Sequence, residues 1–172
     1  MTHPTDPDEL QLLVEDETRV EAVRKTGLLD TPPEEAFDTL TREAVRLTGA
    51  PIAFIALVDR DRDFYKSHSG FGEPLASGRQ LRGRTFCHHT IARRATLQID
   101  DTRADPVFRH VPTVETLGIA AYLGVPLIDD GGQVIGSLCV VDTRPRSWGP
   151  TDRAALEQLV DTAMKEVEAR RP

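Results

Sequence analysis

The segment "RTFCHHTIARRATLQIDDTRADPVF", residues 84–108, places a cysteine, two histidines, four arginines and three aspartates between two apolar runs. Metal binding is the first chemistry that these residue types suggest. Cys87, His88 and His89 are consecutive, however, and neighbours on a helix diverge by about 100°, so the three cannot face one ion. Zinc-binding helices place a second ligand one turn further on, but the residues there are Ile91 and Ala92. We therefore expect no metal, and we predict no cofactor.

The same segment offers the polar groups and rings of a small-molecule site. Asp101 and Asp105 flank Arg103 in a turn-forming sequence, where aspartates accept hydrogen bonds from backbone amides or from a ligand. Phe108 and Tyr122 would add aromatic walls, and both roles of the aspartates stay open. The ligand-binding residues that we predict are Phe86, Cys87, His88, Asp101, Arg103, Asp105, Phe108 and Tyr122.

Cys87 is also a candidate reactive thiol. A helix that begins after Thr85 would place Cys87 in the first turn, near free backbone amides and the positive end of the helix dipole. Arg82 and Arg84 lie nearby in the sequence, so we predict a lowered pKa for the Cys87 thiol. Cys139 lies in the apolar run "VIGSLCVV" and is expected to be buried and inert.

Composition narrows the class of protein. The chain has 172 residues, of which 39% are apolar and 28% charged, as is typical of one globular domain. A formal net charge of −7 argues against nucleic acid and membrane as partners. The longest apolar run has eight residues, far fewer than the roughly 18 of a membrane span. Two cysteines and an acidic N-terminus without signal-peptide features predict a cytoplasmic protein.

Hydrophobic spacing predicts the elements that position these residues. Thr31 and Glu34 have the spacing of a capping box at the start of the second helix, and Gly49 would end that helix. The predicted helices cover residues 7–26, 32–48, 85–94 and 150–170, and the predicted strands cover 51–59, 64–70, 96–99, 119–128 and 133–142. Residues 71–84 have the composition of a mobile loop. Hairpin-linked strands with segregated helices predict an α+β domain with an antiparallel sheet.

Five segments in this order resemble the GAF domain family of small-molecule sensor modules. They are "GLLDTPPEEAFDTLTREAVRLTGAPIAFIALVDRDRDFYKS", "TFCHHTI", "DTRADPVF", "YLGVPLI" and "IGSLCVVDTRPR". We assign residues 1–14 to an N-terminal helical extension and residues 15–172 to the GAF domain. The resemblance implies a central antiparallel β-sheet with terminal helices packed on one face. It also implies a ligand pocket between the other face and the loops and short helices around residues 70–115.

Several positions depart from the family pattern. His88 stands where a small residue is frequent, Val111 stands where Asn often precedes the proline, and Ala120–Ala121 replaces a bulkier or basic pair. These changes leave the identity of the ligand open.

The resemblance implies a sensory or regulatory module of bacterial signal transduction that binds a small molecule and is not an enzyme. Some GAF relatives reduce free methionine sulfoxide, and others attach a bilin. Both kinds use a cysteine in or near the segment that corresponds to residues 109–119. That segment has no cysteine here. Two alternatives stay open: a dimerising interaction protein with a closed pocket, and a redox sensor or methionine-sulfoxide-reductase-like enzyme that acts through Cys87.

The last predicted helix suggests a protein partner. Its apolar stripe continues to the end of the helix, farther than a small sheet should cover, and comprises Leu156, Leu159, Val160, Ala163, Met164 and Val167. We expect a homodimer through the first and last helices, although both stripes would also serve to cover one sheet. Because no output domain is evident in the sequence, a separate signalling protein would receive the signal.

Overall fold

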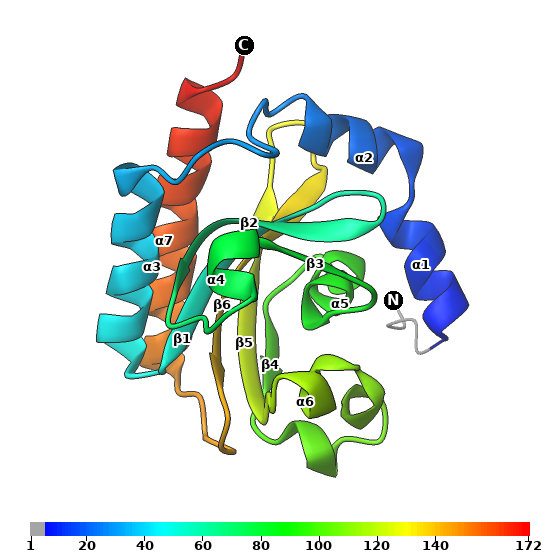
Figure 1. Cartoon of the computed structure of the whole chain (residues 1–172), viewed down its shortest axis with the longest axis vertical. Helices are drawn as coiled ribbons and strands as arrows, with labels where there is room; N and C mark the ends of the chain where they lie inside the picture. The colour runs from blue at the N-terminus through cyan, green and yellow to red at the C-terminus, as the bar shows by residue number, and fades with distance from the viewer. Residues whose placement is uncertain (1–5) are drawn as a thin grey trace.

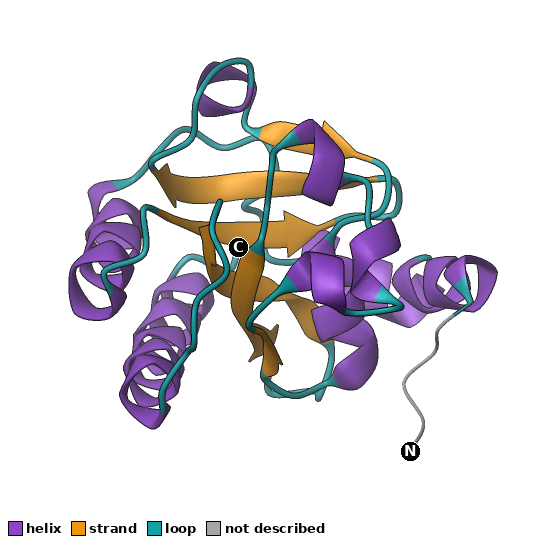
Figure 2. Ribbon diagram, turned by 90° about the horizontal axis from the view of Figure 1, so that it is seen from below, coloured by secondary structure: helices purple, strands orange, loops and turns teal. Residues whose placement is uncertain are grey.

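A six-stranded antiparallel sheet forms the centre of the molecule, in the order β3-β2-β1-β6-β5-β4 (Figures 1 and 2). The computed structural model describes residues 6–172. The strands are β1 (Ile52–Val58), β2 (Arg62–Ser69), β3 (Gln80–Arg82), β4 (Leu97–Ile99), β5 (Ala121–Ile128) and β6 (Val134–Asp142). β1 and β6 lie at the centre and are buried along almost their whole length, because both faces of the sheet are covered. The predicted α+β class, the antiparallel sheet and the two hairpins β1–β2 and β5–β6 are confirmed.

One face of the sheet is covered by α3 (Glu35–Thr48) and α7 (Pro150–Ala169), which lie side by side (Figures 1 and 2). Their apolar stripes pack on β1, β5 and β6 and form the first core, with Phe37 and Leu156 fully buried. α3 ends as predicted at Gly49, whose φ of 74° lies in the left-handed region that favours glycine.

The predicted capping box at Thr31 is wrong. α3 begins at Glu35, after an N-cap at Glu34 that makes no side-chain cap bond. Two prolines follow Thr31, and a proline disfavours helical geometry in the residue before it. The Thr31 hydroxyl instead donates to the carbonyl of Leu28 at 2.6 Å and accepts a hydrogen bond from Lys66 at 2.7 Å.

The other face of the sheet is covered by shorter elements. These are α5 (Phe86–Arg93), the 3-10 turns η1 (Thr102–Ala104) and η2 (Phe108–His110), and α6 (Thr113–Thr116). They pack on a second core that includes Phe54, Tyr65 and Tyr122. Residues 71–84 are not one loop as predicted, because they contain the short helix α4 (Leu75–Gly78) and the edge strand β3.

The predicted first helix is interrupted and forms α1 (Pro7–Val14) and α2 (Glu17–Arg24). Asp16 starts α2 by accepting a hydrogen bond from the amide of Arg19 at 3.1 Å, a typical N-cap contact. Because of this interruption, Val14 of α1 packs in the second core, whereas Val23 of α2 packs in the first core. α1 therefore packs against α5, on the side of the sheet opposite α3 and α7.

Arg19 holds this interruption in place. Its side chain is buried and donates to the carbonyl of Val14 at 2.6 and 2.9 Å and to that of Val134 at 3.2 Å. Burial lowers the pKa of Arg19 to about 10, although Asp63, Asp59 and Asp16 act in the opposite direction. The guanidinium thus joins the N-terminal helices to the start of β6. In the described part of the chain, no helix has the length and apolar character needed to cross a membrane.

Candidate functional site

A small cavity lies between the second face of the sheet, α5 and the segment 71–84. Its volume is about 20 Å³, which is room for roughly one water molecule. The lining is mainly apolar and aromatic and comprises Phe54, Asp63, Tyr65, Phe71, Leu81, Thr85, Phe86, Cys87, Thr113, Leu117, Ile119 and Tyr122. The cavity lies in the region that the resemblance implies, but in this structure its side chains nearly fill it.

Aromatic rings fill the cavity from two sides. Phe71 packs against Phe54 and Tyr65, with ring centroids 5.4 and 4.9 Å away. Phe86 stacks on Tyr122 with centroids 5.1 Å apart. Phe54, Tyr65 and Tyr122 come from the sheet, whereas Phe71 comes from the irregular segment after β2. Among the aromatic groups of the described lining, Phe71 is therefore the one that lies outside every helix and strand.

Among the described residues that line the cavity, Asp63 is the only charged one. It lies on β2 two residues from Tyr65, so both side chains point to the same face of the sheet. Asp63 is fully buried, and its carboxylate accepts a hydrogen bond from Thr85 at 2.7 Å and lies 3.2 Å from Nε2 of His88. A buried carboxylate requires such partners. On the described residues, Nδ1 of His88 has no hydrogen-bond partner.

A second polar cluster lies behind the cavity, between α5 and the sheet. The Tyr122 hydroxyl lies 2.7 Å from that of Thr90 and 3.1 Å from the sulfur of Cys139. Cys139 also contacts the Ser137 hydroxyl at 3.0 Å, and its sulfur is 3.9 Å from that of Cys87. Burial is the main reason that the pKa of Tyr122 is raised well above its ordinary value, so the hydroxyl stays protonated.

The predicted low pKa of Cys87 is wrong. The hydrogen bond with Cys139, and then burial, raise the pKa of Cys87 well above its ordinary value. Thr85 occupies the N-cap position of α5, as predicted, but its hydroxyl makes no cap hydrogen bond and donates to Asp63 instead. Arg82 pairs with Asp61 at 2.7 Å instead of approaching the thiol. Cys139 is buried, as predicted.

The structure separates the predicted site residues into two groups. Phe86, Cys87 and Tyr122 border the cavity, and His88 reaches it through Asp63. The other four predicted residues are absent from the described lining: Asp101, Arg103, Asp105 and Phe108. Phe108 packs beside the cavity wall, with its ring centroid 6.3 Å from that of Phe86.

The predicted aspartates stabilise turns. Asp101 accepts a hydrogen bond from the amide of Arg103 at 3.1 Å, at the start of η1. Asp105 accepts from the amides of Val107 and Phe108 at 2.8 and 3.0 Å. Arg103 is exposed and donates to the carbonyl of Val114 at 3.4 Å. The sequence left two roles open for these aspartates, bonding to backbone amides and bonding to a ligand. In the structure they make hydrogen bonds to backbone amides.

Sequence reasoning missed the residues that β2 contributes. Asp63 falls just before the predicted strand 64–70, although Asp63 and Tyr65 alternate in the pattern of one strand face. Phe71 gives no periodic signal, because it stands between Gly70 and Gly72.

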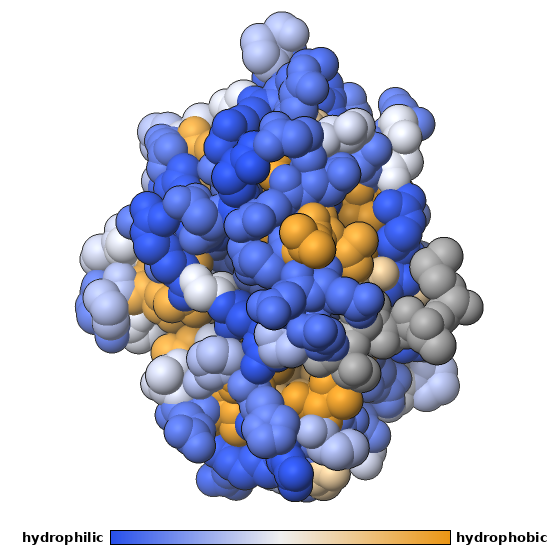
Figure 3. All heavy atoms as spheres, turned by 90° about the vertical axis from the view of Figure 1, so that its right-hand side faces the viewer, coloured by the Kyte–Doolittle hydropathy of each residue, from blue (hydrophilic) through white to orange (hydrophobic). Residues whose placement is uncertain are grey.

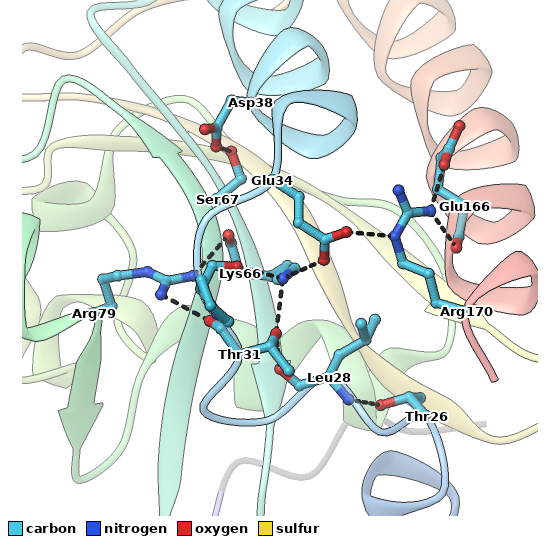
Figure 4. A network of polar contacts seen from close by, with 11 residues as sticks. Thr26, Leu28, Thr31, Glu34, Asp38, Lys66, Ser67, Arg79, Glu166 and Arg170 are labelled. Carbon is cyan, nitrogen blue, oxygen red and sulfur yellow. Dashed lines mark hydrogen bonds and ion pairs between the residues drawn. The ribbon is translucent and has the colours of Figure 1, made fainter. Parts of the chain in front are cut away.

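A further polar network surrounds Lys66 at the first face of the sheet (Figure 4). The Lys66 side chain is fully buried, donates to Thr31 and to the carbonyl of Pro32 at 2.7 Å each, and pairs with Glu34 at 2.6 Å. Glu34 also pairs with Arg170, just after α7, at 2.7 Å. Arg170, followed by Lys66, lowers the pKa of Glu34 below its ordinary range.

Arg79 extends this network toward the cavity. It donates to the carbonyls of Thr31 and Lys66 at 2.8 and 3.0 Å. Because Arg79 lies in the segment 71–84, the network connects the flank of the cavity with the end of α7 (Figure 4).

Comparison with known proteins agrees with this architecture. The family model of the GAF domain matches residues 32–167, and the chain therefore belongs to the GAF domain family. Over 158 residues it is 32% identical to a cyclic di-GMP phosphodiesterase of Pseudomonas aeruginosa, a match that covers 89% of this chain and 26% of that protein. The chain thus corresponds to about a quarter of that relative's length.

Solved structures with the same fold include the GAF domain of an Acinetobacter phosphoenolpyruvate-protein phosphotransferase. The TM-score is 0.64 at 13% identity, with 90% of this chain and 95% of that chain covered. The free methionine-R-sulfoxide reductase of Neisseria meningitidis, solved with its substrate, gives a TM-score of 0.63 at 21% identity, with 95% and 87% covered. At these identities the likeness concerns the fold.

Proposed function

We propose that this GAF domain is a non-catalytic sensory or regulatory module of signal transduction that binds a small molecule beside β2 and α5. The observation that carries the proposal is the fully buried carboxylate of Asp63 in a cavity lined mainly by aromatic and aliphatic groups. Small-molecule sites combine such an apolar lining with a few fixed polar groups. The ligand would have an apolar body and an amine, or another hydrogen-bond donor, that reaches Asp63.

Ligand binding would require the cavity to open. The present volume is about 20 Å³, whereas pockets for ligands of ordinary size have about 300–1,000 Å³. Phe71 is suited to this movement, because it stands between two glycines and Gly70 has a φ of 96°. Only open molecules would bind, so the apparent affinity would equal the affinity of the open form multiplied by the fraction of molecules that are open.

The signal would travel through the network around Lys66. A displaced segment 71–84 would change the contacts of Arg79 with Thr31, and Glu34 connects the same cluster to Arg170 (Figure 4). The end of α7 would then report occupancy to a separate signalling protein, which we propose to be cytoplasmic like this domain.

We also propose a homodimer, formed mainly by α7. A surface hollow of about 860 Å³ lies beside α7 and β5, and Ile128, Val160 and Met164 contribute apolar groups to it. α1 lies on the other side of the molecule, so it does not extend the same surface. Figure 3 shows that side, where apolar atoms form separate patches in a mostly hydrophilic surface; Leu12 of α1 is 70% exposed. The first helix thus has less support as part of the interface than the last.

The small volume of the cavity supports a second candidate, an interaction protein whose pocket stays closed. A thermal-shift screen with metabolites and nucleotides, free methionine sulfoxide included, separates the two. A ligand at a hundredfold excess over its Kd stabilises the native state by about 2.7 kcal/mol. For a domain of this size, each kcal/mol raises Tm by about 2–4 °C.

The variant Phe71→Ala makes this experiment decisive. Removing the ring enlarges the cavity and should increase the affinity for a ligand of the sensor. If neither the native protein nor Phe71→Ala shows a shift with any compound, and the protein still binds a partner, the closed interaction protein is the better description. Leu12→Ala, an exposed residue outside the lining, serves as the control.

A further inference from the structure

The sulfur atoms of Cys87 and Cys139 lie 3.9 Å apart, although the two residues are 52 positions apart in the sequence. Cys87 is in α5 and Cys139 in β6, so the contact joins a helix of the cavity side to the centre of the sheet. A disulfide bond needs a separation of about 2.05 Å. Side-chain rotation together with a small shift of α5 would supply the remaining approach.

The two thiols differ in access. Cys87 borders the cavity, whereas Cys139 does not and is fully buried. The cavity has room for about one water molecule, and hydrogen peroxide is only slightly larger. A small peroxide that enters the cavity therefore meets Cys87 first. Cys139 is reached through Cys87.

No other thiol competes for this partner, because the sequence contains two cysteines. Both are buried, so neither is placed to form a disulfide with a second copy of the folded chain. Fixing two reactive groups in contact strongly favours reaction between them over reaction with groups in solution.

We propose that Cys87 and Cys139 form a dithiol redox site that peroxides oxidise to an intramolecular disulfide. In the first step the Cys87 sulfur attacks one peroxide oxygen and the O–O bond breaks. The Cys87 proton goes to the departing oxygen, which leaves as water, and Cys87 becomes a sulfenic acid.

In the second step the Cys139 sulfur attacks the Cys87 sulfur and the S–O bond breaks. The Cys139 proton joins the departing hydroxyl, which leaves as a second water molecule. In total the two thiols lose two electrons, and one hydrogen peroxide is reduced to two waters.

The proposed site is oxidised more slowly than a cysteine with a lowered pKa. The raised pKa of Cys87 keeps its thiol protonated in the closed domain, so oxidation is slow and depends on access through the cavity. Once formed, the buried disulfide is also protected from reduction by thiols in solution. It would tie α5 to β6 and take the Cys139 S–H from its contacts with Tyr122 and Ser137.

The test treats the reduced, folded chain with hydrogen peroxide over a time course. The protein is then unfolded in acid, alkylated with N-ethylmaleimide at the Cys residues, and weighed by mass spectrometry. We expect the mass to fall by that of two hydrogen atoms, with no alkylation and a Cys87–Cys139 cross-linked peptide. Dithiothreitol, added once the protein is unfolded and the disulfide is accessible, should restore two alkylation sites. The oxidised protein should melt at a higher temperature than the reduced one, because the bond closes a long loop.

Single variants assign the two steps. In Cys139→Ser, the sulfenic acid should accumulate on Cys87 and react with dimedone. In Cys87→Ser, Cys139 should remain unmodified in the folded protein. The proposal is overturned if the native protein retains two alkylatable thiols, if its disulfides are intermolecular, or if Cys139 is oxidised equally well without Cys87. The native cross-link measurement needs no variant, and it is independent of ligand binding, so it also separates this proposal from the sensor function.

Discussion

Tyr122 folds back over Gly124, two residues further along β5, and a β-carbon at position 124 would lie 2.2 Å from the Tyr122 hydroxyl. The glycine thus permits the hydroxyl to reach Thr90 and Cys139. We predict that Gly124→Ala displaces the ring and destabilises the domain by about 1–3 kcal/mol, as overpacking does. Urea denaturation measures the change. Gly72→Ala is the matched control, because no atom lies within 4 Å of the added carbon. Equal effects of both substitutions would contradict this role of Gly124.

Asp63→Asn removes the buried charge while keeping the size of the side chain. The contacts with Thr85 and His88 weaken, so we expect a loss of about 1–3 kcal/mol in the free energy of unfolding. A ligand identified in the thermal-shift screen should bind up to about tenfold more weakly. A tenfold change in Kd corresponds to about 1.4 kcal/mol. Asp61→Asn is the control, because that side chain is 62% exposed. Unchanged affinity in Asp63→Asn would exclude Asp63 as a ligand contact.

Glu34→Gln should destabilise the domain in a pH-dependent manner. Arg170, and then Lys66, lower the pKa of Glu34 in the folded protein below its unfolded value of about 4.3. The stabilisation is therefore complete above that value, and it is lost as the pH falls through the folded pKa. The carboxylate is 35% exposed, so after discounting for solvent screening we expect a loss of about 1–2 kcal/mol at neutral pH.

Denaturation of Glu34→Gln and the native protein between pH 7 and pH 3 tests the sign of this effect: the difference in stability should shrink on acidification. Glu43→Gln, which breaks the surface pair with Arg46, is the control and should have little effect. A difference that grows toward acid pH would show that Glu34 is not stabilised as the carboxylate.

Asp105→Ala should separate the turn from the cavity. The carboxylate accepts two backbone hydrogen bonds, so its removal should cost about 1–2 kcal/mol of stability. Affinity for a ligand of the cavity should not change, because Asp105 is outside the described lining. Asp101→Ala removes one such bond and should cost less. If Asp105→Ala binds the ligand more weakly but is as stable as the native protein, Asp105 is a ligand contact.

Met164→Glu should prevent the proposed dimer, because it places a charge in the hollow beside α7. Light scattering at about 100 μM, where a dimer with a micromolar Kd persists, should give a dimer for the native chain and a monomer for the variant. Leu12→Glu on α1 should leave the native state of association unchanged. A native monomer of 19.0 kDa would exclude the dimer at that concentration.

The long apolar patterns predicted most of the fold. β1, β6 and α7 were found because their buried faces extend over many residues, and α3 ends at Gly49 as expected. Short-range capping signals were less dependable. Asp16 interrupts the first helix by capping α2, and the prolines after Thr31 delay α3. In both places a local hydrogen bond or ring constraint outweighs helical periodicity.

The site was only partly predictable, because its geometry depends on pairing between distant segments. Nothing near Cys87 in the sequence indicates Cys139, which approaches it through the packing of α5 on the sheet. Asp63 became recognisable as a cavity residue only when β2 extended back to Arg62. The pKa of Cys87 followed the same rule: sequence neighbours predicted a decrease, but the tertiary contacts raise it.

The bond from Arg19 to the carbonyl of Val134 has a consequence for synthesis of the chain. The helices α1 and α2 leave the ribosome before the sheet, yet their buried guanidinium finds this acceptor only after β6 has been translated, 115 residues later. β6 is also the strand that joins β1 to β5. The nascent chain therefore holds both halves of an incomplete sheet with exposed strand edges until β6 inserts, and the domain completes folding late, as expected for a topology of long-range contacts.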